Sequence, residues 1–272
     1  MASNGPDSHF PPLSSDVIQA GIRGGIWERL LFFDSVDSTN QRGLALPASD
    51  LPDQGAVLIA ESQTSGRGRR GRNWISTPYR NIYLSAIFSS AALPDDATLL
   101  SLLAAVSGAW ALRITTGLEV RVKWPNDLMV NNRKIGGILS ELRFGSGRPG
   151  RAVIGIGINV NSEAGDFPEE LREVATSVRV ETGDMGSREG IIIEVLKQLE
   201  AWHGRLMAEG GTPVLKEWKR LSSTLGKKVR VALADEVVSG IAEAIDEGGM
   251  LIVRPRSGES RRISAGDVTE LR

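Results

Sequence analysis

The stretch of the chain with the clearest chemical character is residues 66–72, which hold arginines at four positions and glycines at the rest. Glycine lets the backbone adopt conformations that other residues avoid, and it brings N–H groups close to an anion. Arginine guanidinium groups bind phosphate oxygens in a planar, often bidentate geometry. The composition therefore predicts a phosphate-binding loop. Because unpaired like charges repel one another, we expect this loop to become ordered when an anionic ligand binds.

Alternative interpretations of this loop are a nucleic-acid-binding arm or a solvated linker. The loop follows an apolar segment, residues 56–60, and ends at Trp74, which favours a position inside a folded domain. The formal net charge of the chain is -1, whereas a general polyanion binder is usually basic. An RNA-binding module stays open as an alternative, and a gel shift that depends on salt would reveal it.

Residues 66–71 also match the G-x-G-x-x-G pattern of dinucleotide-binding folds. That pattern requires a helix that starts within the glycines and an acidic residue about 20 positions later. Residues 73–78 are a poor helix start, and the first acidic residue after the loop is Asp95. The G-K-[ST] ending of a P-loop is absent too, so a bound nucleotide would be held in a different way.

Three further polar clusters contain residues that could share a ligand with the loop. Lys123 and Asp127 flank a Pro-Asn turn, although turn formation alone explains the Pro and the Asn. Lys134 enters an expected strand with consecutive glycines at residues 136–137, which indicate a bulge or the close approach of a ligand. Residues 155–161 alternate glycine with isoleucine and end in two amides, a pattern that a tightly packed central strand would share.

The residue types that are absent narrow the chemistry. The 272-residue chain has no cysteine, which excludes disulfides, thiolate nucleophiles and Cys-ligated metals. Of the two histidines, His9 lies in a polar, Pro-rich tail of residues 1–15, and His203 falls in an expected helix as a surface or packing residue. A Ser-His-Asp site is therefore not expected. Enzymatic chemistry would depend on Lys, Arg, Asp and a cation held by substrate phosphates, as in phosphoryl and adenylyl transfer.

The hydropathy of the chain indicates a soluble protein. No apolar run approaches the roughly 20 residues that cross a bilayer. Residues 1–15 lack the apolar core of a signal peptide. We therefore expect a cytoplasmic protein that does not bind membranes, with 41% hydrophobic residues to form one large core or two smaller ones.

The periodicity of apolar residues indicates the elements that position these clusters. We predict strands at residues 29–34, 57–61, 81–88, 120–124, 128–130, 135–144 and 152–160, of which residues 81–88 alternate as in a half-buried strand. Helices are predicted from the N-cap residues 37–40 to about Pro47, and at residues 95–116, 188–209 and 212–221. Residues 228–232, 238–242, 250–253 and 261–263 have the pattern of short strands, which indicates a small barrel appended to an α+β domain.

Taken together, the motifs resemble those of the biotin protein ligases and occur in the same order. The matching segments are Ser38-Thr39-Asn40, the glutamine and basic loop of residues 63–74, Lys123-Trp124-Pro125-Asn126-Asp127, Lys134 with residues 136–139, and residues 155–161. The resemblance extends from about Leu30 to the C-terminus. It implies an α+β fold, with a mixed-sheet catalytic domain of the biotin/lipoate ligase type and a small C-terminal SH3-like β-barrel.

This resemblance implies a division of the chain and an activity. Residues 1–27 would be an N-terminal tail and lead-in, residues 28–224 the catalytic biotin- and ATP-binding domain, and residues 225–272 the SH3-like domain. The implied activity is that of an ATP-dependent biotin-[acetyl-CoA-carboxylase] ligase. Biotin would attack the α-phosphate of ATP to give biotinyl-5′-AMP, and a lysine of a biotin carboxyl carrier protein would accept the biotinyl group. Biotin and ATP are the expected substrates, with Mg²⁺ carried by the phosphates and no metal site on the protein.

The resemblance also assigns roles to residues. Lys134 would bridge the biotin carboxylate and the α-phosphate, with Arg67 and Asp127 as further catalytic residues, and Asp127 would orient the acceptor amine. Expected biotin contacts are Ser38, Thr39, Asn40, Gln63, Gly66, Arg67, Gly68, Arg69, Lys134 and Gly137. Expected nucleotide contacts are Arg67, Arg69, Arg70, Arg72, Trp74, Asn126, Lys134, Asn159 and Arg272. The loop would close as a lid that keeps water from the adenylate.

The resemblance bears on partners as well. Relatives that also repress genes carry a helix-turn-helix domain, and too few residues precede the first expected strand to form one, so we expect a monofunctional ligase without direct DNA binding. A lipoate ligase with the same chemistry and a non-catalytic biotin sensor are the alternatives. Titration with each acid and a carrier-labelling assay would distinguish them. A monomer and a homodimer are both open.

Overall fold

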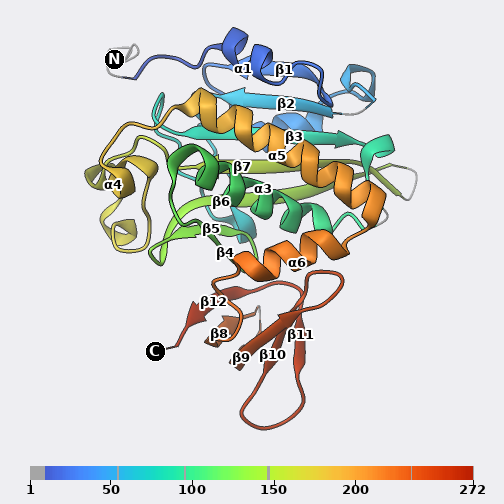
Figure 1. Ribbon diagram of the computed structural model, residues 1–272, viewed down its shortest axis with the longest axis vertical. Coiled ribbons are helices and arrows are strands. Elements are labelled where there is room, and N and C mark those ends of the chain that lie inside the picture. The colour runs from blue at the N-terminus through green and yellow to red at the C-terminus, as the bar shows by residue number, and fades with distance from the viewer. Residues whose placement is uncertain (1–9, 54, 95, 146–147, 234, 272) are drawn as a thin grey trace.

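The computed structural model describes residues 10–271, except residues 54, 95, 146–147 and 234. Its described strands form a seven-stranded sheet in the order β1-β2-β3-β7-β6-β5-β4 and a five-stranded sheet in the order β11-β10-β9-β8-β12. In the larger sheet only β1 and β2 pair in parallel, whereas the smaller sheet is antiparallel. Figure 1 shows the larger sheet behind its helices and the smaller sheet beyond α6. The expected α+β fold with a separate C-terminal β unit is confirmed.

The bounds of the elements follow the predicted periodicity closely. The strands of the larger sheet are β1 (Trp27–Phe33), β2 (Gly55–Ala60), β3 (Ile82–Ser89), β4 (Arg121–Lys123), β5 (Asp127–Val130), β6 (Arg133–Gly145) and β7 (Arg148–Ile158). Those of the smaller sheet are β8 (Lys228–Ala232), β9 (Val237–Ile245), β10 (Leu251–Arg254), β11 (Arg261–Ile263) and β12 (Asp267–Glu270). The α-helices are α1 (Ser15–Gly21), α2 (Thr39–Ala45), α3 (Leu99–Thr116), α4 (Val178–Thr182), α5 (Arg188–Glu209) and α6 (Thr212–Leu221). The short 3₁₀ turns are η1 (Ala48–Asp50), η2 (Arg69–Gly71), η3 (Ser90–Ala92), η4 (Ala164–Asp166) and η5 (Glu169–Leu171).

Helices α3 and α5 pack against each other and cover one face of the larger sheet (Figure 1). The main core lies between these helices and the sheet, and α3 is apolar on all sides because it is enclosed by α5, α6 and the strands. Its length and its mean hydropathy of 1.4 would suit a membrane span, yet 67% of its residues are buried inside the protein. It therefore has the surroundings of a core helix.

Strand β3 is buried on both faces, so the prediction that residues 81–88 form a half-buried strand is wrong. The strand lies between β2 and β7. Its residues Leu84 and Phe88 face the main core, whereas Ile87 belongs to a second, smaller cluster beneath α2. The alternation in the sequence reflects the different sizes of the residues on the two faces of β3, both of which are covered. Apolar periodicity cannot distinguish a strand covered on both faces from a strand with one exposed face.

Three elements had no strong sequence signal. Helix α1 begins inside the segment that was expected to be a tail, and its residue Ile18 is fully buried. Helix α4 is a single short turn, and β12 pairs with β8 at the end of the smaller sheet.

His203 is buried against Phe88 with ring centroids 4.7 Å apart, so the packing role is confirmed. His9 lies outside the described residues.

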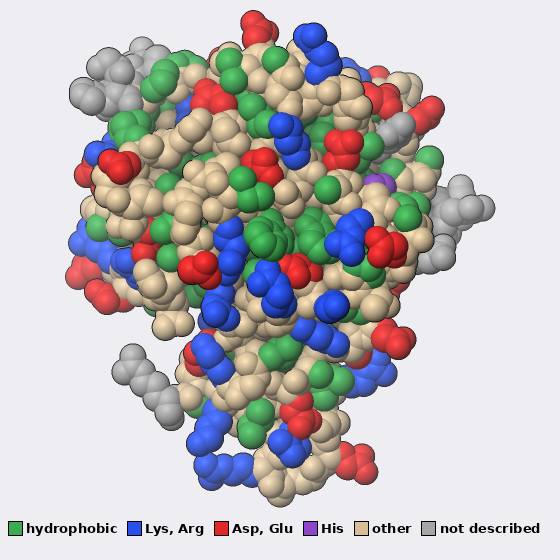
Figure 2. Space-filling view, in the orientation of Figure 1, with side chains coloured by type: hydrophobic (Ala, Val, Ile, Leu, Met, Phe, Trp, Pro, Cys, Tyr) green, Lys and Arg blue, Asp and Glu red, His purple; other side chains and the backbone are tan. Residues whose placement is uncertain are grey.

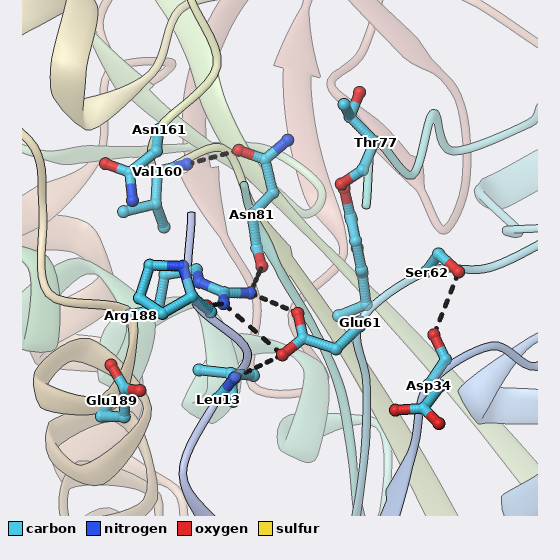
Figure 3. A network of polar contacts seen from close by, with 12 residues as sticks. Leu13, Asp34, Glu61, Ser62, Thr77, Asn81, Val160, Asn161, Arg188 and Glu189 are labelled. Carbon is cyan, nitrogen blue, oxygen red and sulfur yellow. Dashed lines mark hydrogen bonds and ion pairs between the residues drawn. The ribbon is translucent and has the colours of Figure 1, made fainter. Parts of the chain in front are cut away.

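A buried ion pair connects the end of β2 to the start of α5 (Figure 3). Glu61 and Arg188 are both less than one tenth exposed, and Arg188 Nη1 lies 2.6 Å from Glu61 Oε2. The N-terminal segment supplies further partners, because Arg188 donates to the carbonyl of Pro11 and the N–H of Leu13 donates to Glu61. Asn81 Oδ1 accepts a hydrogen bond from the N–H of Val160, which follows β7, at 2.9 Å (Figure 3). These contacts hold the chain just before Gln63, where the basic loop begins.

Helix α2 covers only part of the opposite face of the larger sheet. Beneath it a small apolar cluster contains Leu58, Ile87 and Val153. The remainder of that face carries glycines and polar side chains of β3, β6 and β7. It therefore offers space for a ligand rather than for another helix.

Candidate active site

A cavity of about 530 Å³ lies on this open face of the larger sheet. It is bounded by the start of α2, the basic loop and the turn between β4 and β5. The segment before α4 and the first residues of β12 complete its wall, so the smaller sheet takes part. Cavities of this size suit a molecule as large as a nucleotide or a cofactor.

The floor of the cavity has no side chains at two positions of β7, because other groups lie there. A Cβ atom on Gly157 would lie 2.5 Å from Trp74 Cε2. A Cβ atom on Gly155 would lie 2.4 Å from Asn40 Oδ1. Any larger residue would displace the indole or the amide. The alternating glycines therefore mark a close approach of the protein's own side chains, which fits the tightly packed central strand that the sequence left open.

A one-residue bulge in β6 determines which face of the sheet Lys134 reaches. The register between β5 and β6 shifts between Lys134 and Gly136, so Ile135 has no partner in that ladder. Regular alternation would put Lys134 and Gly136 on the same face. Instead Lys134 lies over Gly137, where a Cβ atom would be 3.2 Å from Lys134 Nζ. The bulge thus directs the ammonium group into the cavity.

Lys134 is held by contacts of its side chain and its backbone. Its Nζ lies 2.5 Å from Asp127 Oδ1, and each side chain keeps part of its surface exposed to the cavity. The ammonium also lies 5.5 Å from the centre of the Trp74 ring. The backbone N–H donates to Val174 O at 2.8 Å, and the carbonyl accepts from Thr176 N at 2.9 Å. Lys134 and Asp127 therefore form one charged pair at the centre of the cavity wall.

One end of the cavity is lined by uncharged hydrogen-bonding groups. Gln63 Oε1 accepts from the N–H of Thr39 at 2.9 Å and from its hydroxyl at 3.2 Å. Ser85 Oγ lies 2.8 Å from Thr39 Oγ1 and 2.6 Å from Asn40 Oδ1. Ser38, the N-cap residue of α2, makes no capping bond with its buried hydroxyl. This arrangement suits a neutral polar group with both donors and acceptors.

Glu141 connects this polar end to the basic loop, and sequence reasoning missed it. Its Oε2 accepts from Asn40 Nδ2 at 2.9 Å, and its Oε1 lies 3.1 Å from Arg67 Nη2. The residue follows Gly137 and Leu139 at steps of two along β6, so strand alternation past the bulge was the signal that could have identified it.

The basic loop is folded back on itself. Arg67 and Asn73 form an isolated antiparallel bridge, and the N–H of Gly68 donates to Arg72 O at 2.7 Å. Trp74 N donates to the carbonyl of Gly66 at 2.8 Å. A Cβ atom on Gly66 would lie 2.4 Å from Trp74 O, so this glycine permits the closure.

Arg67, Arg70 and Arg72 of the loop form ion pairs, so the premise that the loop charges are unpaired is wrong, and ordering of the loop on ligand binding stays a prediction. Arg69 Nη1 donates to Asn126 Oδ1 at 3.3 Å. Arg70 Nη1 lies 3.3 Å from Asp267 Oδ2, and Arg72 contacts the other oxygen of the same carboxylate. Asp267 belongs to β12, which the sequence did not predict as a strand. Distant acids that only the fold brings near therefore offset the repulsion within the loop.

Arg69 is the most enclosed guanidinium of this loop. Burial lowers the pKa of Arg69, while the charges of Asp267 and Asp127 oppose that shift. Arginine titrates so far above neutral pH that Arg69 stays positively charged. The cavity therefore keeps a fixed positive charge beside Asn126.

Two amides and the indole that the resemblance assigned to the nucleotide also line the cavity. Asn126 Nδ2 donates to Ile138 O at 2.5 Å, and Asn159 Nδ2 donates to Thr176 O at 3.0 Å. Trp74 Nε1 is buried and has no hydrogen-bond partner among the described residues. A buried donor of this kind is costly to leave unsatisfied.

Most of the predicted site residues line this one cavity. They are Ser38, Thr39, Asn40, Gln63, Arg67, Gly68, Arg69, Arg72, Trp74, Asn126, Asp127, Lys134, Gly137 and Asn159. Gly66 and Arg70 belong to the loop but do not line the cavity, since Gly66 is closed against Trp74 and Arg70 faces the smaller sheet. Arg272 lies outside the described residues. Within the part of the chain that the structure describes, no group of three or more His, Cys, Asp or Glu side chains could hold a metal ion.

The chain is similar to proteins whose activity is known. The family model described as "Biotin/lipoate A/B protein ligase family" matches residues 32–159, and "Biotin protein ligase C terminal domain" matches residues 224–269. The Biotin--[acetyl-CoA-carboxylase] ligase of Mycobacterium tuberculosis is 34% identical, over 96% of this chain and 97% of that protein. The Bifunctional ligase/repressor BirA of Bacillus spizizenii is 32% identical, over 93% of this chain and 78% of that protein. A solved structure of the biotin protein ligase from Aquifex aeolicus, in complex with biotin and ATP, superposes with a TM-score of 0.77 at 27% identity, covering 90% of this chain and 100% of that one.

Proposed function

Because the chain belongs to the biotin protein ligase family, we propose that it activates biotin as biotinyl-5′-AMP and transfers the biotinyl group to a lysine of a biotin carboxyl carrier protein. Biotin and ATP are its substrates. In this proposal residues 1–27 are an N-terminal tail and lead-in, residues 28–224 are the catalytic domain and residues 225–272 are the SH3-like domain.

The observation that carries this proposal is the polarity of this cavity, whose lining groups differ from one part to another. One end offers neutral hydrogen-bonding groups around Thr39 and Gln63, and the other offers Arg69 and Arg72. Lys134 enters the same cavity, and its ammonium group lies over Gly137. Biotin has a neutral polar ring at one end and a carboxylate at the other, and this carboxylate must meet a phosphate of ATP. The groups that line the cavity fit these two ends.

In the first step a carboxylate oxygen of biotin attacks the α-phosphorus of ATP, and the bond from that phosphorus to the pyrophosphate oxygen breaks. Two anionic groups must approach one another, and negative charge gathers on the oxygens around phosphorus. The Lys134 ammonium and the Arg69 guanidinium both line the cavity and would stabilise this charge, as preorganised cations do. Mg²⁺ would enter on the phosphates of ATP.

In the second step the amine nitrogen of the acceptor lysine attacks the acyl carbon of the adenylate. The bond from that carbon to the phosphate oxygen breaks, AMP leaves, and the nitrogen loses a proton. A lysine with an ordinary pKa of about 10.4 is protonated at neutral pH, so a nearby carboxylate assists. Asp127 is exposed to the cavity and faces it beside Lys134, which supports it as the group that orients the amine.

Mass spectrometry of a carrier domain incubated with the protein, biotin and Mg-ATP tests the proposed function. The expected result is a mass increase of one biotinyl group on one lysine, which depends on ATP. The same reaction with lipoic acid in place of biotin is the matched control and should leave the carrier unlabelled. Labelling by lipoic acid alone, or tight biotin binding without labelling, would contradict the proposal.

A further inference from the structure

A carboxylate of the smaller sheet binds the basic loop at two points. Asp267, the first residue of β12, lies 3.3 Å from Arg70 Nη1 through Oδ2 and contacts Arg72 through Oδ1. Arg70 Nη1 also donates to the carbonyl of Ala232 at 3.1 Å. Ala232 and Asp267 are partners in the β8–β12 ladder. The tip of the loop is thus docked on the paired ends of two strands that are distant from it in sequence.

The backbone of the loop is shaped to make this contact. Arg70 has a φ of 56°, a left-handed conformation that residues other than glycine seldom adopt without compensating interactions. It lies within η2, between the bonded ends of the loop. In this conformation the Arg70 side chain faces the smaller sheet, while Arg69 faces Asn126 in the cavity. The contact with Asp267 and Ala232 is what offsets the unfavourable backbone at Arg70.

Asp267 is also placed where it can act on the ligand site. It lines the cavity together with the next two residues of β12. One carboxylate faces two guanidinium groups, so the loop keeps an excess of positive charge for phosphate. The carboxylate therefore attaches the loop to the rest of the molecule without neutralising it.

We propose that Asp267 is a positioning residue that holds the basic loop closed over the cavity and keeps water from the acyl-adenylate. It acts through Arg70 and Arg72 and touches no reacting atom. This inference rests on the proposed function, because it concerns the stability of the intermediate of that reaction. It gives the smaller sheet a defined task, which is to retain the intermediate until the acceptor lysine arrives.

The reaction that the closed loop prevents is hydrolysis of the mixed anhydride. A water oxygen attacks the acyl carbon, the bond from that carbon to the phosphate oxygen breaks, and biotin, AMP and a proton are released. An opening of the loop admits water and lets the adenylate leave. The ion pairs are partly exposed, with Asp267 at 46%, so salt should weaken them.

The test measures AMP release after a single turnover of adenylate synthesis, with no carrier present. In Asp267→Asn the release rate should rise about three- to tenfold, the range that two partly exposed ion pairs allow. The rate of synthesis at saturating biotin and ATP should fall by a smaller factor than the one by which release rises, because Asp267 acts through Arg70 and Arg72. Added salt should speed release in the unmodified protein and have little effect on Asp267→Asn.

Glu270→Gln is the matched control. It removes a carboxylate from the same strand, whose partner is Lys227 at 2.8 Å rather than the loop. Its AMP release should equal that of the unmodified protein. Asp267→Glu keeps the charge and should restore slow release, which a merely structural loss of stability would not explain.

The outcomes separate this inference from the proposed function. If the unmodified protein forms no biotinyl-adenylate, the proposed function fails by itself. If it forms the adenylate and Asp267→Asn releases AMP at the unmodified rate, the inference is overturned. It is overturned as well if Glu270→Gln releases AMP as fast as Asp267→Asn does. It is also overturned if Asp267→Asn abolishes adenylate synthesis and Asp267→Glu does not restore it.

Discussion

At the scale of residues, the position of one ammonium group depends on one unpaired residue in a strand. Ile135 has no partner in the β5–β6 ladder, and Lys134 consequently lies over Gly137 instead of facing the core. Asp127 meets it at 2.5 Å from the neighbouring strand. The charged pair is therefore preorganised before any substrate binds, which is the arrangement that stabilises developing charge most effectively.

Replacement of Lys134 tests this role directly. In Lys134→Ala we expect biotin-dependent exchange of pyrophosphate into ATP to fall by at least about 100-fold, since removal of one preorganised charge-stabilising group typically has this effect. Lys228→Ala removes an exposed lysine at the start of β8 and should leave exchange unchanged. Exchange close to normal in Lys134→Ala would remove Lys134 from the first step.

At the scale of elements, β3, β6 and β7 form a platform whose cavity face is flat where β7 carries glycine. Gly157 pairs with Gly137 on one side and with Tyr83 on the other. Trp74 lies directly on this platform. Because the indole belongs to the basic loop, the absence of a side chain on β7 sets how far the loop can close.

Gly157→Ala should therefore impair ligand binding more than folding. The added Cβ would lie 2.5 Å from the Trp74 ring, so the indole must move. We expect the KM for ATP or biotin to rise by at least about tenfold, the factor that about 1.4 kcal/mol of lost binding produces. Gly204→Ala, at a helical glycine where a Cβ would meet nothing within 4 Å, is the control and should keep both KM values.

Glu217 of helix α6 is hydrogen-bonded to Trp110 of α3 and lies beside Arg220. Figure 2 shows Lys and Arg side chains gathered near the junction of the helices and the smaller sheet. On α6, Glu217 accepts from Trp110 Nε1 at 2.8 Å and from Arg220 Nη2 at 2.6 Å. Hydrogen bonds from Arg220 lower the pKa of Glu217 below its ordinary value, against the opposing effect of burial, and the Trp110 indole adds to the lowering.

This shift predicts a stability that depends on pH. A carboxyl group whose pKa is lower in the folded state stabilises the fold above its unfolded pKa, which is about 4.3 for Glu, and that stability is lost as the pH falls through the folded pKa. Glu217→Gln should lower the free energy of unfolding in urea by about 1 kcal/mol at neutral pH. The difference from the unmodified protein should shrink as the pH is lowered below about 4.

The control for this prediction is Glu209→Gln on α5. Its carboxylate makes one exposed contact with Arg205 at 3.1 Å, and such pairs contribute little. We expect a change within about 0.5 kcal/mol at any pH. A difference between Glu217→Gln and the unmodified protein that is constant with pH would contradict the proposed titration.

At the scale of the whole molecule, the basic loop makes charged contacts with both sheets, which also share one hydrophobic core. Glu141 of the larger sheet holds Arg67, and Asp267 of the smaller sheet holds Arg70 and Arg72. The cavity therefore has walls from both sheets. Its closure depends on their relative position as well as on the loop itself.

Limited proteolysis measures this closure in the intact protein. Trypsin cleaves after arginine, and the loop arginines at residues 67–72 are partly exposed. Addition of biotin and ATP together should slow cleavage there by at least about fivefold, because bound phosphate adds a second set of partners to guanidiniums that Asp267 and Glu141 already hold. Cleavage at the exposed Arg205 on α5 reports on general protection and should not change. Equal cleavage with and without both substrates would contradict a ligand-dependent lid.

The sequence by itself determined most of the elements and most of the residues that line the cavity, because both follow from local rules. Apolar spacing set the bounds of α5 and α6, and the concentration of arginine and glycine in residues 66–72 marks a loop for anions whatever surrounds it. The tertiary structure alone decided which charges meet. The bulge at Ile135 lies within the β5–β6 hairpin, whereas the contact of Glu141 with Arg67 and the docking of Arg70 on Asp267 join residues that are distant in the chain. Such pairings leave no periodic trace in a sequence, since the energy that selects them comes from packing of the whole fold.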